Sequence, residues 1–254
     1  MKINKIKKLK NNRYELQFDN YSIITYDDII IKYNLLYKKN IDNKLLKEIS
    51  DYNKYYDSYN DALKYATKKC RCEREIFNYL KDKELNSKEI ESIINKLKES
   101  HIINDKLYAR SYINDKLLFS KLSLSKIKED LITNNISSDI IDEEINQIDY
   151  DEIDRLTKLI SKKVNTNHKY SSYILKNKIV NEMVSLGYNY NDISVILDDL
   201  LISFNDYDYL LKEYKKIYSK YSKKYSDYEL KKIIKSKLYS KGFKYEDIKK
   251  EDLF

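Results

Sequence analysis

The sequence predicts a mainly α-helical protein made of tandem three-helix repeats, preceded by a small N-terminal element of two or three β-strands. Three observations predict this fold. One apolar pattern recurs four times at a near-constant interval, the 254 residues include no proline and two glycines, and only the first 25 residues contain short alternating runs rich in β-formers. We therefore expect small helical bundles in an elongated, curved array instead of one globule.

Each copy of the pattern contains an isoleucine, a Leu or Met four residues later, a turn position, an apolar residue and a closing isoleucine. The copies are Ile76-Leu80-Glu84-Leu85-Ile90, Ile127-Leu131-Asn135-Ile136-Ile141, Ile179-Met183-Gly187-Tyr188-Ile193 and Ile234-Leu238-Gly242-Phe243-Ile248. The Leu or Met positions lie 51, 52 and 55 residues apart. The i, i+4 spacing puts the first two side chains on one helix face, and Gly or Asn tolerates the positive φ at which helices often end. We expect the Leu or Met of each copy to be buried at an equivalent place.

The N-terminal element is predicted from its β-formers and from one turn. Residues Ile3–Ile6, Arg13–Phe18 and Tyr21–Thr25 favour strands, and Asp19-Asn20 suits a two-residue hairpin turn between the last two. A short helix should follow from Asp27 to about Asn34, because acidic residues stabilise a helix N-terminus.

The rest of the chain favours helices. Asp42 is a good N-cap for a long helix that extends toward Thr67, either continuously or with one break. In each repeat a core helix, a second helix capped by Ser or Asn and a third, linking helix should follow one another. The linking helices are predicted at Asp105–Phe119, Asp149–Val164 and Asp206–Tyr221. The predicted domains are 1–58 (strands and linker helices), 59–119, 120–168, 169–222 and a partial repeat, 223–254.

Charge is uneven along the chain, although the net charge is +8. Residues 1–60 and 223–254 each carry +4, whereas residues 119–168 carry −3. Basic ends around an acidic middle suggest contact with a polyanion, or with a partner that binds one. A solvated lysine-rich surface, typical of an AT-rich genome, explains the charge equally well. No apolar run of about 18 residues predicts a membrane span, and no apolar signal segment predicts export, so we expect a cytoplasmic protein.

Residues for catalysis, cofactor binding or metal binding are not recognisable. Two glycines cannot build a phosphate-cradling loop, and His101 and His168 stand alone. Cys70 and Cys72 favour reduced thiols. An enzyme with a tyrosine nucleophile would need Arg and His around that tyrosine, but the five arginines are scattered. We predict no enzyme, no cofactor and no metal.

Several motifs follow one another at a spacing that resembles the RecX family of regulatory proteins over almost the full length. They are Ala62-Leu63-x-Tyr65-Ala66, Glu73-x-Glu75-Ile76-x-x-x-Leu80, Ile94-x-x-Leu97, Ile102-Ile103-Asn104-Asp105, Tyr108-Ala109-Arg110-Ser111-Tyr112, Gly187-Tyr188-x-Tyr190 and Gly242-Phe243-x-Tyr245. The N-terminal strands resemble the extension of longer members, which carry an additional repeat. The chain departs from the family's pattern at Leu122-Ser123, at Asn134-Asn135-Ile136 and at Glu84. These departures affect the geometry of local loops and not the assignment to the family.

The resemblance implies a non-catalytic protein that binds the RecA–single-stranded DNA filament and inhibits or modulates its recombinase, ATPase and coprotease activities. It implies RecA as partner. From the basic ends we expect weak direct DNA binding, and we expect a monomer. The alternative is a helical-repeat DNA-binding protein that acts without RecA. Seven cations on the first two repeats are the candidate contact residues: Lys81, Lys83, Arg110, Lys116, Lys121, Lys126 and Lys128.

Overall fold

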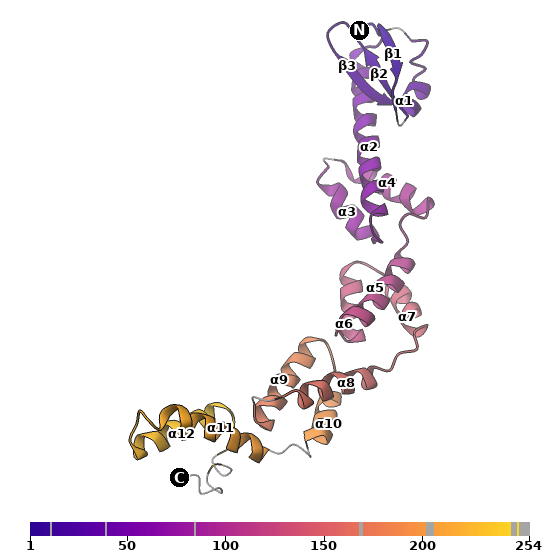
Figure 1. Ribbon diagram of the computed structural model, residues 1–254. Coiled ribbons are helices and arrows are strands. Elements are labelled where there is room, and N and C mark those ends of the chain that lie inside the picture. The colour runs from indigo at the N-terminus through magenta and orange to yellow at the C-terminus, as the bar shows by residue number, and fades with distance from the viewer. Residues whose placement is uncertain are drawn as a thin grey trace. The chain divides into compact units, whose positions relative to one another are not determined.

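The computed structural model describes residues 1–10, 12–38, 40–83, 85–167, 170–201, 206–244 and 248. Glu84, His168 and Tyr245, named above, lie outside the described residues. The chain divides into two compact units, Met1–Tyr112 with Leu131–Glu144, and Ile113–Asp130 with Ile145–Phe254. The described residues are mainly helical, with one small sheet, as the sequence predicts (Figure 1).

The N-terminal sheet contains three antiparallel strands, β1 (Lys5–Lys8), β2 (Arg13–Gln17) and β3 (Ser22–Tyr26), in the order β1-β2-β3. The predicted turn at Asp19-Asn20 is closed by Phe18 N–H, which donates to Tyr21 O at 2.9 Å. Leu16 of β2 lies opposite Ile6 and Ile23 and is fully buried. The alternation of the sequence therefore gives the sheet one apolar face.

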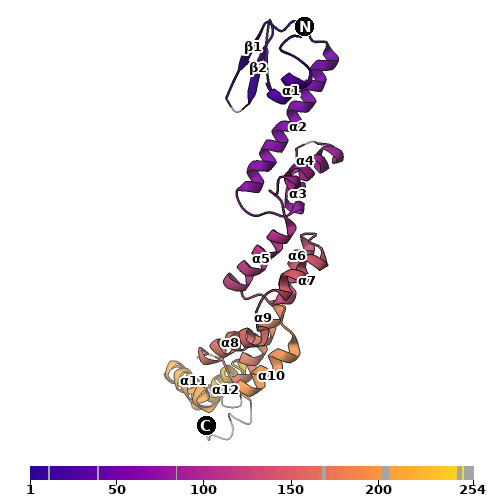
Figure 2. The same ribbon diagram turned by 90° about the vertical axis from the view of Figure 1, so that its right-hand side faces the viewer.

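Two helices cover this face. They are α1 (Asp27–Lys32) and the first half of α2 (Asn43–Thr67), which form one core with the sheet (Figure 2). Asp42 caps α2 as predicted, because its Oδ1 accepts from Leu45 N–H at 2.7 Å. The helix α2 is continuous over 25 residues. It therefore belongs both to the sheet core and to the helical core that follows.

The second half of α2 packs with α3 (Glu73–Lys81) and α4 (Ser87–Glu99) around a first helical core. Ala62, Leu80 and Leu97 are fully buried there, one from each helix. Figure 1 shows α3 and α4 beside the lower turns of α2. Asn86 caps α4, and Glu89 completes the capping box by accepting from Asn86 N–H at 2.9 Å.

Three further helices follow: α5 (Asp105–Phe119), α6 (Leu124–Thr133) and α7 (Ser138–Asn146). The bounds of α5 are those that the sequence predicts. The repeat residues Ile127 and Leu131 of α6 and Ile141 of α7 are fully buried.

The next helices, α8 (Glu152–Asn165), α9 (Ser172–Ser185) and α10 (Tyr190–Leu201), share another core. The prediction that the first of them begins at Asp149 is wrong by three residues. Asp151 is the N-cap, because its Oδ1 accepts from Asp154 N–H at 2.9 Å. The linking helix α8 thus packs with the two helices that come after it.

The described helices end with α11 (Asp206–Tyr221) and α12 (Asp227–Ser240). They pack together with Phe243 and Ile248 around a core that includes Ile217 and Leu238. The bounds of α11 are those predicted from sequence. The predicted domain boundaries after residues 58, 119, 168 and 222 stay a prediction.

The repeated pattern has one structural meaning at all four copies. Leu80, Leu131, Met183 and Leu238 are each 0% exposed, as predicted. The turn positions described are left-handed, with φ of 62° at Asn135, 92° at Gly187 and 83° at Gly242. The pattern therefore marks a fully buried position in each copy and, at the three turn positions that the structure describes, the place where the core helix ends.

Candidate functional site

Two of the seven candidate contact residues, Lys81 and Lys83, lie at the end of α3. Lys81 is exposed in the last helical turn. The half-buried Lys83 donates to Asp61 Oδ2 of α2 at 2.9 Å, and its Nζ lies 5.3 Å from the centre of the Tyr79 ring. The hydrogen bond with Asp61 raises the pKa of Lys83. The charge of Lys83 therefore already helps to join α3 to α2.

Arg110 on α5 is also engaged within the protein. Its Nε donates to Glu144 Oε2 at 2.7 Å and its Nη2 donates to Glu144 Oε1 at 3.2 Å. The Glu144 side chain is 1% exposed, so the guanidinium supplies the positive charge that a buried carboxylate needs. Hydrogen bonding to Glu144 raises the pKa of Arg110. One turn away, Lys106 forms an ion pair with Glu143.

The other four candidates lie on or near α5 and α6 in the second unit. Lys126 forms an i, i+3 ion pair with Glu129 at 2.7 Å, and its N–H donates to Ser123 Oγ at 3.2 Å. Lys116 and Lys128 are half-buried and have interaction partners of their own. Lys121 is exposed in the loop between the two helices. The structure thus does not gather the seven cations into one site, and it leaves Lys81 and Lys121 as the exposed candidates for which it gives no ionic partner.

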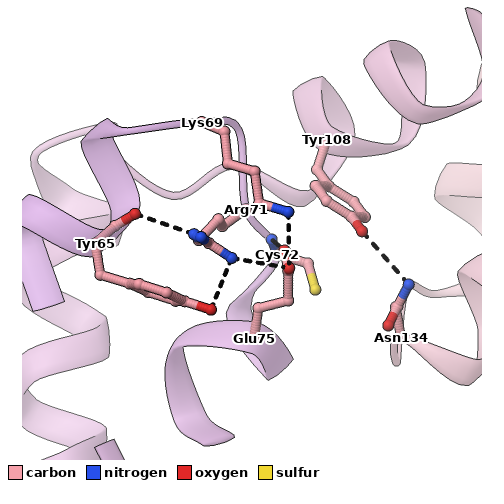
Figure 3. Close-up of polar contacts among 7 residues, drawn as sticks. All are labelled: Tyr65, Lys69, Arg71, Cys72, Glu75, Tyr108 and Asn134. Carbon is pink, nitrogen blue, oxygen red and sulfur yellow. Dashed lines mark hydrogen bonds and ion pairs between the residues drawn. The ribbon is translucent and has the colours of Figure 1, made fainter. Parts of the chain in front are cut away.

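A dense polar cluster marks the N-terminus of α3 (Figure 3). Arg71 Nε donates to Tyr65 O at 3.0 Å, and its Nη1 donates to Tyr65 Oη at 2.7 Å and Glu75 Oε1 at 3.1 Å. The guanidinium carbon lies 3.4 Å from the centre of the Tyr65 ring. The other oxygen of Glu75 accepts from the N–H of the buried N-cap, Cys72, at 3.3 Å. The cluster fixes α3 against the end of α2, and burial raises the pKa of the Cys72 thiol.

A second set of contacts reaches this end of α3 from farther along the chain. Tyr108 of α5 points toward Asn134, whose Nδ2 donates to Tyr108 Oη at 3.4 Å (Figure 3). Arg74 of α3 donates to Asn135 Oδ1 at 2.8 Å and to Thr133 O. Burial raises the pKa of Tyr108 far above its usual range. The left-handed turn after α6 is therefore held at the start of α3.

The same contact, between a left-handed turn and the start of an earlier core helix, occurs twice in the second unit. Ser123 N–H, just before α6, donates to Leu186 O at 2.9 Å in the turn that contains Gly187. Ser171, the N-cap of α9, donates from Oγ to Gly242 O at 3.0 Å. A β-carbon at Gly187 would lie 2.5 Å from Ser123 Oγ, and one at Gly242 would lie 2.5 Å from Ile174 Cγ1. These turns therefore need glycine for close approach as well as for φ.

At each of these three junctions, where a left-handed turn meets the start of an earlier core helix, a carboxylate adds one more contact. The first residue of each core helix donates its backbone N–H to an acid two helices farther along the chain. The three pairs are Glu73 N to Asp105 Oδ1 at 3.1 Å, Leu124 N to Glu152 Oε1 at 2.8 Å and Ser172 N to Asp206 Oδ1 at 2.7 Å. Each bond satisfies an orphan donor at a helix N-terminus. Burial raises the pKa of the Asp105 carboxyl, and the bond from Glu73 opposes that rise.

Sequence reasoning missed these junctions, although it noted their parts. It placed an Asp at the start of each linking helix and named no partner for that acid. The available signal was the recurrence of an acid at the start of α5, α8 and α11, in step with the apolar pattern. A recurrence in step with a structural repeat indicates a contact between neighbouring units.

The described residues include two cysteines and one histidine. No three His, Cys, Asp or Glu side chains gather as a metal site in that part of the chain. Among the helices that the structure describes, none is both long and apolar enough to cross a bilayer. Cys70 and Cys72 are free thiols, one exposed and one buried. His101 is exposed and lies in a left-handed turn after α4.

Comparison with protein families gives a match to the family described as "RecX, first three-helix domain" over residues 59–97. These residues comprise the last turns of α2, α3 and most of α4, the helices that share the first helical core.

Similar proteins extend the match over the whole chain. The "Regulatory protein RecX" of Lactococcus lactis subsp. cremoris (strain MG1363) is 34% identical over 256 residues, which cover 97% of this chain and 95% of that protein. The protein of the same name from Streptococcus agalactiae serotype V is 32% identical and covers 98% of this chain and 97% of its own.

Solved structures show the same fold. A "Crystal structure of regulatory protein RecX" superposes with a TM-score of 0.64 at 22% identity, over 78% of this chain and 98% of that one. A second, "Crystal structure of RecX from Lactobacillus salivarius", gives a TM-score of 0.50 at 28% identity, over 59% of this chain and 97% of that one.

Proposed function

The chain belongs to the RecX family of regulatory proteins, and we propose that it is a non-catalytic regulator of the RecA recombinase. In this proposal it binds the RecA–single-stranded DNA filament and lowers its recombinase, ATPase and coprotease activities. The observation that carries the proposal is the similarity to regulatory RecX proteins over nearly the whole of both chains. The absence of a metal-type ligand cluster from the described residues is compatible with it.

Binding would rest on many modest contacts made together. Several small helical cores would each offer a few side chains to RecA, and their contributions would combine through a high effective concentration. The exposed Lys81 and Lys121 are the strongest of the seven candidates, because Lys83, Arg110 and Lys126 are paired within the protein. We place the protein in the cytoplasm and expect it to be a monomer. Light scattering of the purified protein can test the oligomeric state.

Titration of the protein into RecA, ATP and single-stranded DNA tests the function. ATP hydrolysis should fall with added protein, and the protein alone should hydrolyse nothing. Deleting residues 223–254 removes ten lysines, so it should weaken inhibition while the earlier cores keep their circular dichroism. Unchanged ATP hydrolysis with the folded full-length protein and its cognate RecA would contradict the proposal.

A pair of charge reversals tests the contact residues. Lys81→Glu with Lys121→Glu should raise the concentration needed for half-inhibition. The control, Lys47→Glu with Lys158→Glu, changes the charge equally at two other exposed lysines. Equal loss in both variants would mean that net charge alone, and not these two positions, decides binding.

The second candidate function is DNA binding without RecA. The lysine-rich N-terminal strand is the observation that favours it. Binding to naked single-stranded DNA that equals binding to the filament at the same salt would favour this candidate.

A further inference from the structure

The N-terminal end of the chain carries charge of one sign. Residues 1–14 include six basic side chains, and the first acidic residue is Glu15. Five of the six are exposed lysines: Lys2, Lys5, Lys7, Lys8 and Lys10. In the helical part, residues 231–244 are equally basic and free of acids, but there Lys241 pairs with Glu213.

The sheet places these lysines along one free edge. On its inner side β1 pairs with β2, and Asn4 N–H to Gln17 O (2.8 Å) and Leu9 N–H to Arg13 O (2.7 Å) extend this pairing beyond both ends of the strand. On its outer side β1 has no neighbouring strand among the described residues (Figure 2). The six residues from Asn4 to Leu9, in extended conformation, span about 20 Å.

The lysines of this edge, defined as Lys2, Lys5, Lys7, Lys8 and Lys10, are not neutralised. None of them has an ion pair with a carboxylate in the part of the chain that the structure describes. Glu15 lies opposite Lys7 in the register and is the nearest acid by position, yet the two form no such pair. Because successive side chains of a strand point to opposite faces, the ammonium groups surround the edge from both sides.

The edge is also held in place. Ile3 is buried in the sheet core, and Ile41 N–H donates to Met1 O at 2.8 Å. Lys2 and Asn40 form an antiparallel bridge. The backbone that carries the lysines is therefore ordered before any partner binds, which lowers the entropy cost of binding.

We propose that the β1 edge binds the phosphate backbone of single-stranded DNA. Lysines supply most sequence-independent affinity for nucleic acid, through phosphate contacts that release counterions. An exposed strand edge adds backbone N–H groups, which can donate to phosphate oxygens. The choice of DNA over RNA rests on the proposed function; the phosphate contact itself does not.

Two observations favour a single strand over a duplex or an acidic protein. Reading a duplex groove takes a helix or a two-stranded ribbon, whereas α1, one of the two helices that cover this sheet, begins with Asp27 and Asp28. The half-exposed ring of Tyr21 stacks on Phe18, with 4.8 Å between the ring centres. The Tyr21 hydroxyl donates to Met1 Sδ at 2.7 Å, next to the start of the edge. An aromatic face of this kind can stack on an unpaired base. An acidic protein partner has no such base to offer.

Fluorescence anisotropy with a labelled oligo(dT), without RecA, tests the proposal. The variant K5Q/K7Q/K8Q/K10Q should weaken binding by about tenfold or more at low salt. It should also flatten the dependence of log K on log[salt] by about 2–3 units, because each phosphate contact to a single strand contributes about 0.7. The control K98Q/K158Q/K163Q/K176Q removes four lysines that form ion pairs inside the protein, and it should bind nearly as the wild type does.

Each other outcome would overturn the proposal. Equal binding by the wild type and the edge variant, with both folded by circular dichroism, would exclude the edge as the site. Equal losses in the edge variant and the control would mean that net charge alone is sensed. Tighter binding to a duplex of the same length, to anionic vesicles or to RecA without DNA would assign the edge to another partner. Failure of RecA inhibition leaves this test unaffected, because it contains no RecA.

Discussion

The β1 edge and the helical cores use the same residue types in opposite ways. On the edge, exposed lysines stand in a line without carboxylates. In the helical part, three cations join one helix to another: Lys83 to Asp61 of α2, Arg110 to Glu144 of α7, and Arg155 to the end of α5. A lysine on the edge is therefore available to a partner, whereas these three cations are already part of the fold.

The difference shows why charge along the sequence is a weak guide to binding. Residues 1–60 and 223–254 have the same net charge of +4. At the C-terminal side Lys241 pairs with the buried Glu213 at 2.8 Å, whereas the edge lysines have no comparable partner. What decides the role of a cation is the carboxylate or carbonyl that the fold brings to it.

The largest expected effect breaks the helical cores and leaves the edge intact. Leu80→Ala should lower the free energy of unfolding by about 2–5 kcal/mol, because a fully buried Leu leaves a cavity. Urea unfolding followed by circular dichroism measures it. Its neighbour Lys81→Ala, exposed in the last turn of α3, should change stability by less than about 0.5 kcal/mol. A similarly small change at Leu80 would show that the repeated pattern is misassigned there.

A smaller effect should separate a structural cation from an available one. Arg155 donates to the carbonyls of Leu117 and Ser120 at the end of α5. Arg155→Ala should cost about 1.5–3 kcal/mol, because both carbonyls lose a charged donor, while oligo(dT) affinity should hardly change.

Lys158→Ala is the control for Arg155, since its ion pair with Asp154 is exposed. Differential scanning calorimetry should show a clear shift for Arg155→Ala and almost none for Lys158→Ala. Equal shifts would mean that the bonds of Arg155 do not stabilise the fold, and the contrast between the two regions would fail.

The smallest effect concerns Lys83. Its pair with Asp61 is partly exposed and screened by solvent, so Lys83→Ala should cost about 0.2–1 kcal/mol, and less at high salt. Chemical unfolding at two salt concentrations measures this. A loss that does not shrink with salt would show that packing of the lysine stem on Tyr79, and not the ion pair, carries the contribution.

The sequence predicts the helices and their cores well because a local rule governs them. The i, i+4 apolar pairs and the caps at Asp42 and Asn86 act within a few residues. The buried Leu or Met of every copy and the left-handed turn at Asn135 follow from the same pattern.

The partners of charged side chains lie beyond such rules. Arg110 and Glu144 are 34 residues apart, and Arg155 is 38 residues from Leu117. Only the packing of helices decides which acid or carbonyl comes within reach, so five of the seven candidates looked available and have partners instead. For the same reason the pattern does not tell with which neighbour α8 shares its core.

The most direct test of the account compares two partners at one salt concentration. Binding of the full-length protein to a RecA–single-stranded DNA filament should be tighter than binding to the same DNA without RecA, because the filament adds protein contacts to the phosphate contacts. The edge variant K5Q/K7Q/K8Q/K10Q should lose most of its affinity for naked DNA and keep its preference for the filament. Equal or tighter binding of the wild type to naked DNA would contradict a role as a regulator of the RecA filament.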